Sequence, residues 1–184
     1  GEKVNPLDKQ KIRQIRKDIQ LIFQDPYASL HPFKKVNSVL EEVLVVHFSK
    51  SKIKNQKRII DLLSQVGLDY EFKDRYPHEL SGGQRQRVVI ARALAVEPKV
   101  LICDESVAAL DISVQAQVLN LLNDLKYSLG LSYLFISHDL AVVKYMSDRI
   151  MVMKDGKLIE LQEAENLYKS PENNYTRNLI EAIP

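Results

Sequence analysis

The sequence predicts an α/β fold that is built on a parallel β-sheet. Residues 100–103 form a short, fully apolar run, and residues 133–136 form a second strand-like run further along the chain. Between them lies an amphipathic stretch whose apolar residues recur at helical spacing. A strand, a helix and a strand in this order make the crossover unit that joins parallel strands. Because the run at 100–103 is apolar throughout, we expect this strand to be covered on both faces.

The elements before this unit follow from turn residues and apolar spacing. Residues 1–20 are charged, and we expect them to be irregular. The run Gln20–Phe23 predicts a strand, which Asp25-Pro26 ends with a turn. Between residues 36 and 66 apolar side chains return at helical spacing, and Gly67 is well placed to cap the end of this helical segment.

Later elements are predicted in the same way. A further helix is expected from Ser81 to Val96, where Pro98 stops it, and its largely apolar circumference predicts that it is buried. Gly130 closes the amphipathic helix of the crossover unit. Asp155-Gly156 is typical of a two-residue hairpin, and the polar tail from Glu163 onward is expected to be helical in patches.

The composition is that of one globular domain, or of a domain with an inserted subdomain. The chain has 184 residues, of which 45% are hydrophobic, so it can build a core and gives no hint of disorder. With 26 basic and 24 acidic residues, its net charge of +2 does not suggest a nucleic-acid-binding surface. No apolar stretch is long enough to span a bilayer. The single cysteine, Cys103, excludes an internal disulfide and is expected to be buried packing.

A serine and two glycines begin the helix predicted at residue 81. The free N–H groups and the positive end of the helix dipole favour an anion there. The missing side chains of Gly82 and Gly83 let a phosphate approach the backbone, and the Ser81 hydroxyl adds a donor. The same residues are also typical of a plain helix cap, so the pattern alone leaves both interpretations open.

Two adjacent carboxylates, Asp104 and Glu105, end the apolar strand. Ligands of α/β sheets bind at the carboxyl ends of strands, where neighbouring residues point in different directions. One carboxylate can therefore face a metal ion while the other faces an attacking water molecule. The alternative is that the pair only begins a solvated loop. His138 and Gln24 also follow predicted strands, but neither residue is informative alone.

The string Leu80-Ser81-Gly82-Gly83-Gln84 matches the LSGGQ signature of ATP-binding-cassette (ABC) ATPases letter for letter. Other motifs resemble those of the same family and stand in its order: Gln24 in a Q-loop, Asp104-Glu105 in a Walker B strand, Ala109-Leu110-Asp111 as a D-loop, and His138 as a switch histidine. This resemblance covers essentially the whole chain. It implies a P-loop NTPase-type parallel-sheet core with an inserted α-helical subdomain.

The resemblance also implies a catalytic role for four residues, with ATP and Mg²⁺ as cofactors. Asp104 would hold Mg²⁺, usually through water, and Glu105 would act as general base. His138 would hydrogen-bond the γ-phosphate, and Gln24 would reach the metal ion and the attacking water. In such ATPases two domains face each other head to tail. The segment Ser81–Gln84 would then bind the ATP of the partner subunit, and Asp111 would cross the dimer interface.

Two stretches, Phe23–Leu30 and Ser170–Pro184, are similar to the dipeptide/oligopeptide (and nickel) importer branch of bacterial ABC ATPases. The implied function is that of an ATP-hydrolysing subunit that powers import of peptides or a similar small solute. Its implied partners are transmembrane permease subunits, a second ATP-binding subunit and, indirectly, a substrate-binding protein. No nucleic acid is expected as a partner. Its implied location is peripheral, at the cytoplasmic face of the cell membrane.

The motifs suggest how the chain is divided. Residues 1–32 are expected to form part of the ATPase core with the Q-loop, and residues 33–96 the helical subdomain with the signature. Residues 97–160 would return to the core, with the Walker B, D-loop and switch histidine motifs. Residues 161–184 would form a tail of the oligopeptide-importer type.

One motif of the family has no counterpart in the sequence. A phosphate-binding loop has the pattern Gly-x-x-x-x-Gly-Lys-Ser/Thr, and none of the chain's six glycines belongs to one. Because the chain also opens with Gly1 rather than methionine, we expect it to be a piece of a longer protein whose upstream part holds this loop. The piece alone is expected to bind MgATP weakly and not to hydrolyse it.

Two alternatives remain open at this point. A soluble ABC ATPase of DNA repair or translation would share these motifs, although such proteins usually carry insertions or a second cassette. A natural half-site subunit would donate its signature to a partner's ATP and would be inactive at its own site.

Overall fold

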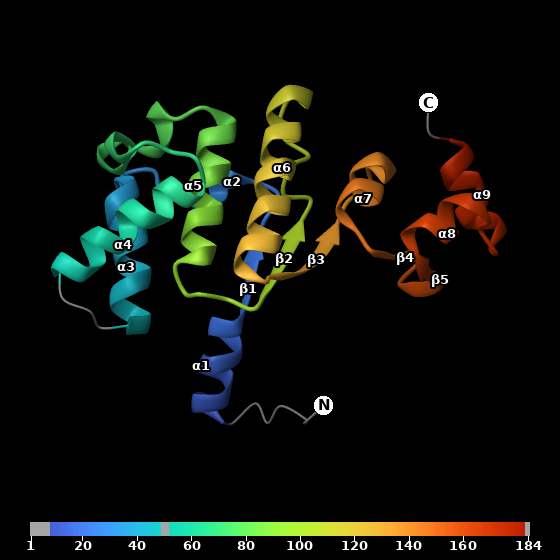
Figure 1. Ribbon diagram of the computed structural model, residues 1–184, viewed down its shortest axis with the longest axis horizontal. Coiled ribbons are helices and arrows are strands. Elements are labelled where there is room, and N and C mark those ends of the chain that lie inside the picture. Colours follow the sequence, from blue (N-terminus) through green and yellow to red (C-terminus); the bar gives the residue numbers. More distant parts are fainter. Residues whose placement is uncertain (1–7, 49–51, 183–184) are drawn as a thin grey trace. The chain divides into compact units, whose positions relative to one another are not determined.

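The structure is a computed structural model that describes residues 8–48 and 52–182 (Figure 1). The chain divides into an N-terminal unit that ends at Leu134 and a C-terminal unit that begins at Phe135. The domain boundaries predicted at residues 32, 96 and 160 stay predictions.

A three-stranded sheet organises the N-terminal unit. Its order is β1 (Ile19–Ile22), β2 (Val100–Asp104) and β3 (Ser132–Ile136). Strands β1 and β2 run parallel, in a register that pairs Ile19 with Val100 and Ile22 with Cys103. The strands predicted from the apolar runs are therefore present, and β1 and β2 are parallel neighbours although they lie far apart in sequence.

Helices cover one face of this sheet in the part of the chain that the structure describes. Leu101 and Cys103 of β2 are fully buried, whereas Val100 and Ile102 on the other face are half-buried. The open face also carries apolar side chains of the neighbouring strands, which are 38–49% exposed: Ile19, Leu21 and Leu134. In the described residues α5 and α6 pack from one side, so coverage of the second face of β2 stays a prediction (Figure 1).

Helix α1 (Lys9–Asp18) lies where an irregular segment was expected, so that expectation is wrong. The side chain of Asp8 caps its first turn by accepting the N–H of Lys11 at 3.0 Å. Lysine, arginine and glutamine, which fill most of the helix, have good helix propensity. The helix has no fully buried residue, so the charge pattern that suggested irregular structure is that of a solvated helix.

The predicted helical segment between residues 36 and 66 forms α3 (Val36–Phe48) and α4 (Lys52–Gln65). Helical spacing predicts a buried stripe of Val39, Val43, Val46, Ile59, Leu62, Leu63 and Val66. All are buried except Val43, which is half-buried, and Val46, which is 54% exposed, so that part of the prediction is wrong; Leu40 and Leu44 fill the core instead. Gly67 follows with a positive φ of 67°, as expected of a residue that ends a helix. Two short 3-10 turns, η1 (Tyr70–Asp74) and η2 (Pro77–Glu79), lead to the next helix.

Helices α5 (Gly82–Leu94) and α6 (Ile112–Leu129) connect this helical layer to the sheet. Most of α5 is buried, as predicted from its apolar circumference. Helix α6 ends at Gly130 with a φ of 64°, and the hydroxyl of Tyr133 in β3 donates to the Leu122 carbonyl of α6 at 2.7 Å. A short helix, α2 (Pro26–Ser29), follows β1 and packs on α5.

The C-terminal unit is a hairpin with helices around it. Its elements are α7 (Leu140–Met146), β4 (Arg149–Lys154), β5 (Lys157–Glu163), α8 (Ala164–Lys169) and α9 (Asn174–Glu181). Strands β4 and β5 are antiparallel and joined by Asp155 and Gly156, whose φ angles of 50° and 74° suit a type I′ turn. The predicted hairpin is confirmed, as are the helices of the tail. None of the helices in the described residues has the length and apolar character of a membrane span.

A buried carboxylate attaches the tail to the hairpin. Glu160 of β5 is 6% exposed and accepts hydrogen bonds from Gln162 Nε2 at 2.8 Å, Glu172 N at 2.9 Å and Asn173 N at 3.2 Å. Burial alone would raise the pKa of Glu160, but hydrogen bonds from the tail and from Gln162 hold that pKa below its ordinary value of 4.5. The carboxylate therefore fixes the segment that leads into α9.

Replacing Glu160 with glutamine is expected to lower the free energy of unfolding by about 1–3 kcal/mol at pH 7, because an amide NH₂ cannot accept the tail's N–H groups. Since the folded pKa is lowered, the carboxylate stabilises the protein above pH 4.5, and this stabilisation is lost as the pH falls through the folded pKa. Urea unfolding at pH 7 and in acid measures both effects.

The matched control is Glu163→Gln in the same strand, whose exposed ion pair with Arg149 at 3.6 Å should contribute less than about 1 kcal/mol. An equal loss of stability for Glu160→Gln at both pH values would contradict the role of the ionised carboxylate.

Candidate active site

The carboxyl ends of β1 and β2 bring together three of the predicted site residues. Because Ile22 pairs with Cys103 in a parallel register, both strands end at the same edge of the sheet. Gln24 follows β1 and is exposed, while Asp104 is the last residue of β2 and is half-buried. Glu105 follows directly. The edge thus gathers an amide and two carboxylates, all with oxygen atoms that suit a hard cation.

Glu105 has an unusual backbone conformation that the sequence did not reveal. Its φ is +45°, in the left-handed region that side-chain-bearing residues rarely adopt and that costs roughly 1–2 kcal/mol. The carbonyl of Glu105 accepts the N–H of Ala108 at 3.0 Å in the turn that follows. Backbone strain of this kind gathers at functional sites, where it aims a side chain.

The magnesium site predicted at Asp104 and Gln24 fits this edge. The described residues contain no group of three or more His, Cys, Asp or Glu side chains that could hold a metal ion without other ligands. Mg²⁺ in phosphoryl-transfer sites is typically bound by only one or two protein ligands, with phosphate and water oxygens completing the shell. A half-buried carboxylate beside an amide is a donor set of that kind.

The signature segment (Leu80–Gln84) forms the start of α5. The hydroxyl of Ser81 accepts the N–H of Gln84 at 3.3 Å, and Gln84 Oε1 accepts the N–H of Ser81 at 2.9 Å, so the pair is a capping box. The capping interpretation of Ser81 is therefore correct. It leaves the anion interpretation in place, because a hydroxyl that accepts one hydrogen bond still has a proton to donate. The N–H groups of Gly82 and Gly83 begin the helix and have no partner within it.

Helix packing explains one of the two glycines. A Cβ atom on Gly83 would lie 2.3 Å from Val114 Cγ1 of α6, which real contacts do not allow. A Cβ atom on Gly82 would meet Leu110 Cδ2 at 3.4 Å, an ordinary contact. Gly83 is thus required by the close approach of α5 and α6. Gly82 has room for a side chain, so packing does not explain why this position lacks one.

The predicted D-loop residue Asp111 caps helix α6. Its carboxylate accepts the N–H of Val114 at 3.0 Å and the hydroxyl of Ser113 at 2.9 Å, and these hydrogen bonds lower its pKa. The neighbouring Leu110 and Val114 are the residues that approach the two signature glycines. The structure therefore places the D-loop beside the start of α5, a proximity that the sequence did not predict.

His138 belongs to the C-terminal unit. It is exposed and follows β3, and the next residue, Asp139, caps α7 by accepting the N–H groups of Ala141 at 2.9 Å and Val142 at 3.2 Å. The turn is also held by the hydroxyl of Ser137, which accepts the N–H of Asp139 at 3.0 Å. The predicted contact of His138 with a γ-phosphate stays a prediction.

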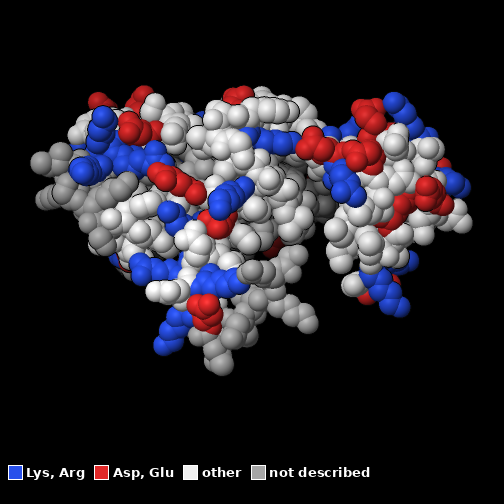
Figure 2. Space-filling view, turned by 60° about the horizontal axis from the view of Figure 1, so that its bottom comes forward, with Lys and Arg blue, Asp and Glu red and all other residues white. Residues whose placement is uncertain are grey.

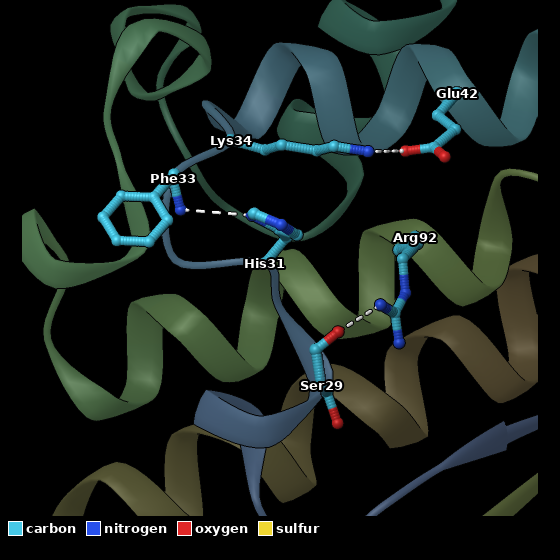
Figure 3. Close-up of polar contacts among 6 residues, drawn as sticks. All are labelled: Ser29, His31, Phe33, Lys34, Glu42 and Arg92. Atoms are coloured by element: carbon cyan, nitrogen blue, oxygen red, sulfur yellow. Dashed lines mark hydrogen bonds and ion pairs between the residues drawn. The ribbon is translucent and has the colours of Figure 1, made fainter.

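A cleft of about 430 Å³ lies beyond α2, between the chain that follows it, α3 and α5. Figure 3 shows its polar side chains: Lys34 pairs with Glu42 at 2.7 Å, and the guanidinium of Arg92 donates to the carbonyl of Ser29. Burial lowers the pKa of His47 on its wall, and the charges of Arg13 and Lys17 lower it further. Sequence analysis missed this cleft, because its walls come from segments that are far apart in the chain.

Charged side chains of both signs are mixed over the face shown in Figure 2, in keeping with the nearly balanced composition. The cleft differs from this pattern, because Glu42 is the one acidic residue on its wall and pairs with Lys34, while Arg92 and two histidines also line it.

Comparison with known proteins agrees with the motifs. A profile described as ABC transporter matches residues 1–108. The chain is 52% identical over 177 residues to the oligopeptide transport ATP-binding protein OppF of Bacillus subtilis, a match that covers 96% of this chain and 58% of that protein. It is 51% identical over 169 residues to the dipeptide transport ATP-binding protein DppF of Haemophilus influenzae, covering 92% of this chain and 52% of that protein. The chain thus spans about half the length of these curated relatives.

The fold matches a solved structure as well. The ATP-binding cassette MJ0796, in a dimeric post-hydrolysis state bound to ADP and Pi, superimposes with a TM-score of 0.72 at 30% identity, covering 87% of this chain and 69% of that one. This match confirms the predicted P-loop NTPase-type α/β fold. With a family profile matched over more than half of its length and relatives about 50% identical along almost all of it, the chain belongs to the ABC transporter family.

Proposed function

We propose that this chain is the greater part of the catalytic domain of an ATP-binding subunit, one that hydrolyses ATP to power import of peptides or similar small solutes across the cytoplasmic membrane. The observation that carries the proposal is the strained Glu105 beside Asp104, at an edge that Gln24 shares. The names of the relatives, which are an oligopeptide and a dipeptide transport ATP-binding protein, support the class of solute.

In the proposed mechanism the residues at the edge divide the work. Glu105 takes a proton from the attacking water onto its carboxylate, and Gln24 orients that water. Asp104 would hold Mg²⁺, and the bound ion would supply positive charge near the phosphate oxygens. His138 donates a hydrogen bond to the γ-phosphate. The parallel register of β1 and β2 brings Gln24, Asp104 and Glu105 to one edge of the sheet.

The signature segment acts on a nucleotide held by a second ATP-binding subunit. Ser81 is exposed and Gly82 half-buried at the start of α5, where the Ser81 hydroxyl and the positive end of the helix dipole favour a phosphate from outside the chain. Gly83, the next residue of the signature, is buried. The dimeric state of the solved relative, bound to ADP and Pi, supports this arrangement. Asp111, beside the signature, would cross that interface.

The remaining partners follow from the class of transporter. Transmembrane permease subunits would hold the protein at the cytoplasmic face of the membrane as a peripheral subunit, and a substrate-binding protein would deliver the solute to them.

Isolation of the full-length protein from its source cells in mild detergent tests the proposal. Co-purification with a membrane permease and a second ATP-binding subunit is expected, together with loss of labelled-peptide uptake when the subunit is deleted. Recovery with ribosomes or DNA, and unchanged uptake in the deletion strain, would instead identify a soluble ABC ATPase.

A further inference from the structure

Two arginines of α5 hold the short helix α2 against it. The guanidinium carbon of Arg85 lies 3.9 Å from the centre of the Tyr27 ring, a close cation–π contact. Further along α5, Arg92 donates to the carbonyl of Ser29 at the other end of α2, the contact drawn in Figure 3. Positions 85 and 92 are separated by about two helical turns and therefore share a face of α5. Helix α2 is thus attached at both of its ends.

Arg85 also reaches the chain that presents the signature. Its Nη1 donates to the carbonyl of Leu80 at 2.6 Å and to that of Pro77 at 3.2 Å. Leu80 directly precedes Ser81, the residue that caps α5. One half-buried guanidinium therefore contacts α2 through its face and the signature segment through its edge.

Helix α2 is in turn fixed to the residue before it. Asp25 caps the helix by accepting the N–H of Tyr27 at 2.7 Å, and its carbonyl accepts the hydroxyl of Ser29 at 2.9 Å. Because Asp25 follows Gln24, a displacement of α2 moves the backbone next to Gln24. The same displacement acts on Arg85 through Tyr27.

We propose that Arg85 is a positioning residue that links α2 to the signature segment, so that the signature is correctly presented to the partner's nucleotide only while α2 is seated on α5. This role rests on the proposed function, since it makes the segment after Gln24 a regulator of the signature. Arg85 acts through the carbonyl of Leu80 and the ring of Tyr27. It does not contact the nucleotide.

The test uses the complete transporter purified from its source cells and compares ATP hydrolysis by the full-length subunit alone with hydrolysis by the complex. Tyr27→Leu removes the ring and leaves the two carbonyl contacts of Arg85 intact. Loss of a cation–π contact predicts that hydrolysis by the complex falls about fivefold. Hydrolysis by the isolated subunit should fall by a similar factor, because a pair of these subunits depends on the same signature segment. The midpoint of thermal unfolding should fall by no more than about 2–4 °C, because Tyr27 is 53% exposed and only the cation–π contact is lost.

Tyr27→Phe is the matched control, since it keeps the ring and should keep full activity in the complex. Arg85→Lys, which loses the planar group, should resemble Tyr27→Leu, and the double variant should be no worse than either single variant if the two side chains act together. The link is refuted if Tyr27→Leu keeps full activity in the complex, or if Tyr27→Phe loses as much. If the wild-type subunits do not assemble into a complex, or if the assembled complex does not hydrolyse ATP, that result would contradict the proposed function instead.

Discussion

Replacing Glu105 with glutamine in the full-length protein is expected to lower ATP turnover by roughly 10²- to 10⁴-fold while MgATP binding is retained. Glutamine keeps the size of the side chain and its hydrogen-bonding oxygen but cannot take a proton from water. The backbone strain at φ +45° is the same in both proteins, so the free energy of unfolding should change little. Single-turnover hydrolysis and calorimetric titration with MgATP measure the two quantities separately.

The chain supplies a matched control for this variant. Glu97 is another glutamate with a positive φ, of 56°, and its exposed side chain pairs with Arg58 at 3.4 Å, away from the carboxyl ends of the strands. Glu97→Gln should leave turnover unchanged. Undiminished hydrolysis by Glu105→Gln would refute the general-base role and would favour a half-site subunit that is inactive at its own site.

Glu105→Gly adds a readout of the strain. Glycine adopts positive φ without the penalty that other residues meet, so relief of the strain should contribute about 1 kcal/mol to the stability of this variant, which should be as inactive as Glu105→Gln. A loss of stability would show that the glutamate side chain is held by favourable contacts that outweigh the strain.

Substitution of Gly82 with aspartate is expected to reduce ATP turnover by roughly 10²- to 10³-fold without lowering stability. A carboxylate at the first position of α5 would occupy the space in which a phosphate should meet the helix N-terminus. Its negative charge would also repel the phosphate. The same charge interacts favourably with the helix dipole, and the space beside Leu110 accepts a side chain. Activity and stability should therefore change in opposite directions, which distinguishes this variant from one that only misfolds.

Gly82→Ala is the control for adding any side chain. Gly82→Asn is the control for a side chain with the size of aspartate but without the negative charge. Both are expected to retain far more activity than Gly82→Asp. Position 83 is unsuitable for the experiment, because any side chain there overlaps Val114 and would perturb folding. If Gly82→Asp hydrolyses ATP as fast as Gly82→Asn, the helix start serves as a cap only.

Local sequence patterns were sufficient for most of the elements and for much of the site. The strand at residues 100–103, the helix closed by Gly130 and the hairpin at Asp155-Gly156 each depend on a few neighbouring residues, and all three are present. Charge alone does not predict helix α1, because a charged segment can be irregular or helical, and charged residues with long side chains are good helix formers. The motifs identified the signature segment and Asp104-Glu105 by resemblance.

Features that depend on distant contacts could not be predicted in the same way. Ser29 and Arg92 are 63 residues apart, and no local pattern brings them together. The left-handed conformation of Glu105 follows from how β2 ends in a turn, since glutamate has no preference for positive φ. Whether a strand is covered on one face or two depends on which helices pack on it.

The attachment of Glu160 to residues 172 and 173 affects how deletions of the tail should be interpreted. A chain cut after Ser170 keeps Gln162 as a donor to this carboxylate but loses both backbone donors, which leaves a charge in an apolar hairpin without its main partners. Such a deletion would weaken the fold of the whole C-terminal unit. Loss of transport in a tail deletion is therefore no proof of a docking signal in the tail, and point substitutions on the exposed side of α9 are the safer way to map one.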